Sequence, residues 1–65
     1  FPEAHPGLVM RGFRLKEEWS QEELAERLAI TQTRVSELEN GKRHISVAMA
    51  KRLSKIFDIT YRAFL

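Results

Sequence analysis

The chain has 65 residues, no cysteine and a formal net charge of +2 at pH 7. This length allows one small domain with a single hydrophobic core, and the lack of cysteine excludes disulfides and thiolate metal sites. No apolar run approaches the roughly 18 residues needed to cross a bilayer and no signal-peptide pattern is present, so we expect a cytoplasmic protein without membrane contact.

The first element is expected to be a helix that follows an irregular segment. Residues 1–7 hold both prolines and one glycine, which predicts a lead-in to a domain over residues 8–65. Helical spacing predicts the first helix over residues 8–18. Gly12 lies inside it and costs about 1 kcal/mol relative to alanine, which a close helix–helix contact would explain. The expected apolar contacts of this helix are Val9, Met10 and Phe13.

The second helix has a complete start signal. Ser20 can act as its N-cap, and Glu23 three residues later completes a capping box. Trp19 before the cap and Leu24 after it form a hydrophobic staple. The helix is expected to end near residue 29, and its apolar face is formed by Leu24, Ala25 and Leu28.

Three further helix starts follow. Thr31, Ser46 and Thr60 are expected to cap a third helix, a fourth helix and a last turn. Asn40 and Gly41 predict the end of the third helix, because glycine adopts the left-handed conformation at little cost. The fold class is therefore all-α, a compact domain of five short helices. The inward-facing residues of the third and fourth helices are expected to be Val35, Leu38, Met49, Ala50, Leu53 and Phe57, and the apolar residues of the last turn are Tyr61, Phe64 and Leu65.

Residues 21–40 meet the requirements of a helix-turn-helix. Two short helices that cross steeply need a small residue where they approach, and Ala25 lies there. They also need a tight turn, which residues 29–31 supply. In this arrangement the second helix projects outward, and its first residues can reach base edges in the DNA major groove. The residues expected to pack both helices against the rest of the domain are Leu24, Leu28, Ile30, Val35 and Leu38.

Charge is distributed unevenly along the chain. Residues 17–39 carry seven acidic and two basic side chains, whereas residues 40–65 carry six basic and one acidic. Such a distribution can present a basic face to an anionic polymer. By itself it is equally consistent with a solvated surface of mixed charge, so it supports DNA binding only together with the motif.

The segments QEELAERL (21–28) and TQTRVSELENGK (31–42) resemble the helix-turn-helix of the lambdoid phage repressor and Cro family. The similarity extends over about residues 8–65. It implies a lambda-repressor-like fold that binds double-stranded DNA sequence-specifically, as a homodimer on a palindromic operator, and regulates transcription, with repression as the default. The family has glycine at the turn where this chain has Ala29, and a left-handed alanine would cost about 1 kcal/mol.

The resemblance also implies roles for individual residues. Arg34 could reach a base or a phosphate. The alternative for the base-reading positions is a solvated helix surface, and the alternative for His44 is an exposed loop histidine. Glutamine can pair with adenine, threonine can contact the thymine methyl and a carboxylate can accept from cytosine. The residues expected to read bases are Gln32, Thr33, Ser36 and Glu37. The residues expected to contact phosphates are Gln21, Asn40, Lys42, Arg43 and His44.

Other positions are expected to be structural. The resemblance implies a salt bridge between Arg14 and Glu39 that orients the third helix. Phe13 and Trp19 are interpreted as core rather than as a base-stacking platform. The expected dimer interface is Tyr61, Arg62, Phe64 and Leu65. The alternative is that the last turn closes the core, with Phe64 favouring the core and Tyr61 the interface.

An enzyme, a cofactor and a metal are not expected. His5 and His44 lie far apart without a helical partner histidine, and no phosphate loop or nucleophile motif is present. Two alternatives to a plain regulator stay open. One is an antitoxin that binds a toxin protein and autoregulates its operon, because residues 5–7 and 45–53 resemble the host-inhibition-of-growth type. The other is a protein-interaction module that has lost DNA binding.

Overall fold

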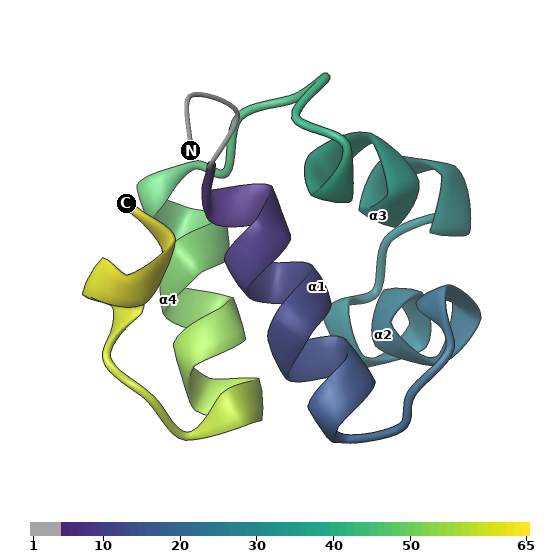
Figure 1. The fold of residues 1–65 in the computed structure, drawn as a ribbon, viewed down its shortest axis with the longest axis horizontal. Helices are drawn as coiled ribbons and strands as arrows, with labels where there is room; N and C mark the ends of the chain where they lie inside the picture. Colours follow the sequence, from purple (N-terminus) through teal and green to yellow (C-terminus); the bar gives the residue numbers. More distant parts are fainter. Residues whose placement is uncertain (1–4) are drawn as a thin grey trace.

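Four α-helices and one 3-10 turn make up residues 5–65, the part of the chain that the structure, a computed structural model, describes (Figure 1). Their bounds are α1 (Pro6–Lys16), α2 (Gln21–Leu28), α3 (Gln32–Glu39), α4 (Val47–Phe57) and η1 (Tyr61–Phe64). The all-α class is confirmed. The prediction of a fifth helix is wrong in type, because the four residues of η1 are closed by i to i+3 bonds, such as Ala63 N to Thr60 O at 3.1 Å.

Three of the four predicted N-caps are confirmed. The hydroxyls of Ser20, Thr31 and Ser46 each accept a hydrogen bond from the backbone N–H three residues later, at 3.1, 3.2 and 3.1 Å. Each bond satisfies an N–H group that has no partner within its helix, which stabilises the start of that helix by about 1 kcal/mol. Thr60 makes no such side-chain bond at the start of η1.

The first helix begins earlier than its sequence predicts. His5 is its N-cap, because the imidazole Nδ1 accepts from the backbone N–H of Gly7 at 3.1 Å. Pro6 occupies the first helical position, where its fixed φ suits the helix and its missing N–H is not needed. The predicted start of the first helix at residue 8 is therefore wrong. Residues 1–4 of the predicted lead-in lie outside the described part of the chain.

The turns between helices depend on residues in the left-handed conformation. Gly41 has φ 76° after α3 and Ala29 has φ 57° after α2, so the turn alanine adopts the strained conformation considered above. Glu18 has φ 61°, which ends α1 at Lys16 rather than at residue 18. An L-residue in this region costs about 1–2 kcal/mol, which only a well-packed surrounding fold can offset.

One hydrophobic core joins all five elements. In Figure 1 the helix α1 runs between α4 and the α2–α3 pair. Phe13 and Trp19 pack against this core through the ring of Phe57, each with a centroid distance of 5.5 Å, so both are core residues as expected. Val9 is an exception among the predicted contacts, because it is 38% exposed. The buried hydrophobic residues are Met10, Leu24, Ala25, Leu28, Val35, Leu38, Ala50, Leu53 and Phe64.

The close helix–helix contact that glycine permits is at Gly7, not at Gly12. A Cβ added to Gly7 would collide with the backbone carbonyl oxygen of Leu38, whereas one added to Gly12 would meet nothing within 4 Å. The contact brings the start of α1 against the end of α3. Across residues 5–65, no helix has the length and apolar character that a membrane crossing requires.

Candidate nucleic-acid interface

The helix-turn-helix leaves the first turn of α3 exposed. Val35 is fully buried, which fixes the inner side of the helix. Gln32, Thr33 and Arg34 lie on the other sides and are exposed. Within residues 5–65 their side chains make no hydrogen bond and no ion pair with the protein. These three side chains are therefore available to a ligand.

A shallow hollow separates the start of α2 from the first turns of α3. It has a volume of about 370 Å³ and is lined by Gln21, Gln32, Thr33 and Ser36. The structure thus brings together three of the four residues predicted to read bases and one predicted phosphate contact. All four lining side chains are polar, so the hollow offers hydrogen-bond donors and acceptors rather than an apolar pocket.

Glu37, the fourth predicted base reader, does not line this hollow. Its carboxylate pairs with the Nε of Arg43 at 3.3 Å, and both side chains are partly exposed. An exposed pair of this kind contributes about 0–1 kcal/mol, so a competing ligand can separate it cheaply. Until then the pair reduces both the negative charge on α3 and the positive charge of the following loop.

The loop that follows α3 carries the remaining predicted phosphate contacts. Lys42, Arg43 and His44 are all exposed, and their loop folds back through a bond from Lys42 N to Glu37 O at 3.0 Å. Asn40 is also exposed, but its side-chain amide is engaged by other parts of the protein. Its Oδ1 accepts from Arg11, and its Nδ2 donates one hydrogen to Ser36 of α3. Only the second amide hydrogen is therefore left for a phosphate.

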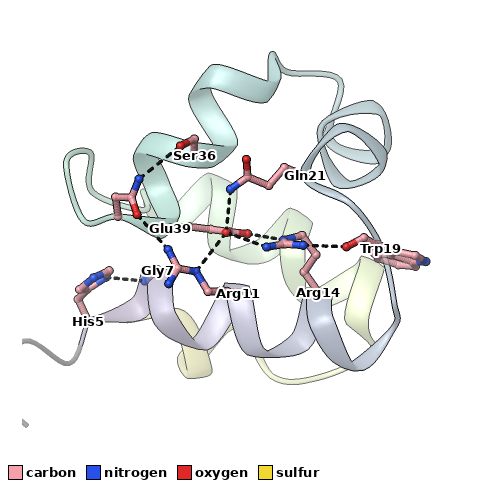
Figure 2. A network of polar contacts seen from close by, with 9 residues as sticks. His5, Gly7, Arg11, Arg14, Trp19, Gln21, Ser36 and Glu39 are labelled. Atoms are coloured by element: carbon pink, nitrogen blue, oxygen red, sulfur yellow. Dashed lines mark hydrogen bonds and ion pairs between the residues drawn. The ribbon is translucent and has the colours of Figure 1, made fainter.

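A buried ion pair anchors the end of α3 to α1 (Figure 2). The guanidinium of Arg14 donates from Nε to Glu39 Oε2 at 2.6 Å and from Nη2 to Oε1 at 3.1 Å. Its Nη1 donates to the backbone oxygen of Trp19 at 2.8 Å. Glu39 is fully buried and Arg14 is 9% exposed, so the salt bridge implied by the resemblance is present and largely shielded from water.

Two more donors converge on the same carboxylate. Gln21 Nε2 donates to Glu39 Oε1 at 3.1 Å, and Arg11 Nε lies 3.4 Å from the same oxygen. Burial alone would raise the pKa of Glu39. The hydrogen bonds from Arg14, Gln21 and Arg11, with the charge of Arg14, outweigh it and lower that pKa below its ordinary value. Glu39 is thus held as an anion that couples α1, α2 and α3.

Arg11 is the member of this network that sequence reasoning missed. It lies one helical turn after Gly7 and one turn before Arg14, so the three share one face of α1. That i, i+4, i+7 spacing, with a glycine where helices approach, was the available signal. Gln21 also differs from its expected role, since one of its amide hydrogens is directed to Glu39 and the other remains available for a phosphate.

Only part of the predicted dimer surface is exposed. Phe64 is fully buried with its ring beside Phe13 of α1 and Phe57 of α4, so its assignment to the interface is wrong and the alternative that it closes the core is confirmed. Leu65 is 59% exposed and Arg62 is exposed. Tyr61 is half-buried, with Lys51 Nζ 5.7 Å from its ring centroid. No group of histidine, cysteine and acidic side chains in residues 5–65 is arranged to hold a metal.

A family model described as helix-turn-helix matches residues 10–64. The chain belongs to this family, and it is a DNA-binding helix-turn-helix regulator rather than an enzyme. No curated protein matches the sequence significantly.

Three solved structures share the fold. The Pseudomonas aeruginosa antitoxin HigA with the higBA promoter is 30% identical with a TM-score of 0.83, and the match covers 95% of this chain and 68% of that one. PA4674 from Pseudomonas aeruginosa, solved in complex with its operator DNA, is 31% identical with a TM-score of 0.82, covering 94% and 67%. The restriction-modification controller protein C.AhdI from Aeromonas hydrophila is 28% identical with a TM-score of 0.81, covering 92% and 91%.

Proposed function

We propose that this helix-turn-helix regulator binds a palindromic operator as a homodimer and represses transcription. The observation that carries the proposal is the polar hollow formed by Gln21, Gln32, Thr33 and Ser36, at the start of α2 and α3. The similar proteins solved with a promoter or with operator DNA support the same use of the fold. Occupation of an operator that overlaps a promoter would exclude polymerase.

Base recognition is assigned to the exposed first turn of α3. In the major groove the Gln32 amide can bond both N6 and N7 of adenine, and Thr33 can offer its methyl to thymine or its hydroxyl to an acceptor. Neither side chain has to break an internal hydrogen bond to do so, because none is present in the described residues. Each good contact contributes about 1–3 kcal/mol of discrimination.

Phosphate binding is assigned to both sides of that turn. Lys42, Arg43 and His44 would hold the backbone beyond the end of α3, and the free amide hydrogen of Gln21 would do so at the start of α2. Arg34 projects from α3, its side chain has no partner among residues 5–65, and it can reach either a base or a phosphate. Basic contacts release condensed counterions, so affinity should fall as salt rises.

The dimer would place two copies of α3 in successive major grooves. Half-sites about one helical turn apart match two such domains related by a two-fold axis. The surface proposed for the contact is the exposed part of the last turn, formed by Tyr61, Arg62 and Leu65.

Selection from a random duplex pool, followed by titration of the selected duplex at several salt concentrations, tests the proposal. We expect a palindromic sequence. Gln32→Ala should lose about 1–3 kcal/mol of affinity for it while remaining folded. Lys42→Gln should weaken binding to all sequences and reduce the salt slope by about 1, whereas the control Lys55→Gln, on α4, should leave the slope unchanged. Enrichment of no sequence would overturn the proposal.

The second candidate function is that of an antitoxin, and the similarity to HigA favours it. The residues His5, Pro6 and Gly7, which suggested this class, have structural tasks in this chain: a cap, a first helical residue and a close helix contact. Their presence is therefore explained without a toxin. Co-expression with the product of the adjacent gene tests the candidate. Rescue of growth together with co-purification would support it, and absence of both would exclude it.

A further inference from the structure

A chain of hydrogen bonds leads from α1 to the middle of α3. Arg11 Nη2 donates to Asn40 Oδ1 at 2.9 Å, and Asn40 Nδ2 donates to Ser36 Oγ at 3.3 Å. Figure 2 shows Arg11 on the α1 side and Ser36 on the α3 side of this chain. The buried ion pair of Arg14 and Glu39 does not require these bonds, so they need a separate explanation.

The direction of each bond follows from the groups involved. A guanidinium can only donate, so the oxygen of the Asn40 amide must face Arg11. The amide nitrogen then faces Ser36 and can also only donate, so the Ser36 oxygen accepts. An amide without such a partner could flip, and it would then accept from the serine instead. Arg11 therefore fixes the direction of the bond between Asn40 and Ser36, which leaves the Ser36 hydroxyl its hydrogen and one lone pair for an outside partner.

The hydroxyl hydrogen of Ser36 remains available. Within residues 5–65, Ser36 makes no other side-chain hydrogen bond, including the backbone bond that serine often forms inside helices. Its side chain lines the same hollow as Gln32 and Thr33, the residues assigned to base recognition. This hydroxyl hydrogen is thus placed at the proposed DNA surface.

We propose that Arg11 is a specificity-positioning residue, which acts through Asn40 to fix the Ser36 hydroxyl as a hydrogen-bond donor toward a base. The proposal rests on the proposed function. A donor at this point selects a major-groove acceptor: N7 or O6 of guanine, N7 of adenine or O4 of thymine. It favours these acceptors over the amino group of cytosine, which could bond only to the one remaining lone pair of the serine oxygen.

Arg11 is itself held in place. Its Nε lies 3.4 Å from Glu39 Oε1, and it is one turn from Gly7, whose missing Cβ leaves room for the backbone of α3 at Leu38. Its side chain is 38% exposed, so it lies at the edge of the network and its removal leaves the buried pair of Arg14 and Glu39 intact. This makes Arg11 separable from the structural anchor by mutation.

Three variants test the proposal by selection from a random duplex pool, followed by affinity measurements on duplexes that differ at one base pair. Arg11→Met keeps the stem and removes the donors. Asn40→Asp keeps an acceptor for Arg11 but cannot donate to Ser36, so the serine must donate inward and presents its lone pairs to the DNA. Ser36→Ala removes the hydroxyl. Circular dichroism confirms that each variant folds.

We expect one base pair of the operator to respond. Discrimination there, on the order of fivefold to tenfold in the unmodified protein, should fall to about onefold in Ser36→Ala and in Arg11→Met. In the Ser36→Ala background, Arg11→Met should cause no further change in the discrimination at this base pair. Asn40→Asp should shift the preference at that base pair toward cytosine N4 or adenine N6, while its added negative charge weakens all sequences alike.

The failures are distinguishable. If the unmodified protein enriches no sequence, the proposed function fails and the inference with it. If it enriches a motif but Arg11→Met and Asn40→Asp only weaken binding uniformly, the proposed function stands and the positioning role is overturned. An equal effect of Arg11→Met with and without Ser36 would also overturn it, because Arg11 would then act independently of the hydroxyl.

Discussion

The two ends of α3 are built differently. At its end, Glu39 is fully buried and receives hydrogen bonds from three side chains of α1 and α2. At its start, Gln32, Thr33 and Arg34 are exposed, and their side chains have no hydrogen-bond partner among the described residues. One end is anchored and the other is left available, within a helix of eight residues.

This difference shows how a small domain can present a precise surface. A buried ion pair offsets most of its own desolvation cost and contributes little net stability, but it permits only one arrangement of its partners. The anchored end therefore sets the direction of α3, and the free end can keep polar side chains that no internal contact needs. The stability of the domain and its binding surface should respond separately to mutation.

The largest expected effect is at the anchored end. Glu39→Gln would leave Arg14 buried without a counter-charge, and we expect a loss of about 3–5 kcal/mol in the free energy of unfolding, measured with urea. The matched control is Glu37→Gln, which breaks the exposed pair with Arg43 and should cost less than about 1 kcal/mol. Equal losses in the two variants would contradict the distinction between the ends.

The same contribution should depend on pH. The pKa of folded Glu39 lies below the ordinary value of 4.5, so its ionised form stabilises the fold above that pH. The contribution is lost as pH falls through the depressed folded pKa. We expect the difference in unfolding free energy between the unmodified protein and Glu39→Gln to be constant from pH 7 to about 4.5 and to shrink below it. A difference independent of pH down to 3 would show that the charge is not responsible.

The two glycines of α1 sharpen the comparison at the helix contact. Gly7→Ala should destabilise the domain by roughly 1–3 kcal/mol, because the new methyl group would have to displace the backbone of α3 at Leu38. Gly12→Ala meets no neighbour and should stabilise by up to about 1 kcal/mol through helix propensity. Thermal unfolding measures whether each variant is stabilised or destabilised. A change in the same direction in both variants would contradict the packing of α1 against α3.

The smallest expected effect concerns the turn that leads to the free end. Ala29 has φ 57°, a conformation that glycine adopts without strain. Ala29→Gly should therefore stabilise the domain by about 1 kcal/mol without changing operator affinity. Ala48→Gly, at an exposed helical alanine of α4, is the control and should destabilise by as much as about 1 kcal/mol. Destabilisation by both changes would mean that the turn is not strained.

Local signals in the sequence were sufficient for the starts of α2, α3 and α4 and for the helix-turn-helix, but not for the start of α1 at its cap His5. Ser20, Thr31 and Ser46 start helices because a hydroxyl three residues before an N–H satisfies it, which depends only on neighbouring residues. The periodic apolar positions identified every residue of the buried core, with Val9 as an added error. The last turn was misjudged because four residues are too few for periodicity to separate an α-helix from a 3-10 turn.

Contacts between elements were decided by the tertiary structure alone. Helix propensity does not distinguish Gly7 from Gly12. Only the approach of α3 makes a glycine necessary at position 7, because a side chain there would collide with the backbone of Leu38. The same holds for Arg11, whose partner Asn40 lies 29 residues away. Hydrogen bonds at that separation depend on how helices pack, and the direction in which Ser36 presents its hydrogen depends on the whole chain of donors. Short-range patterns therefore specify the elements, whereas the polarity of the binding surface is a property of their assembly.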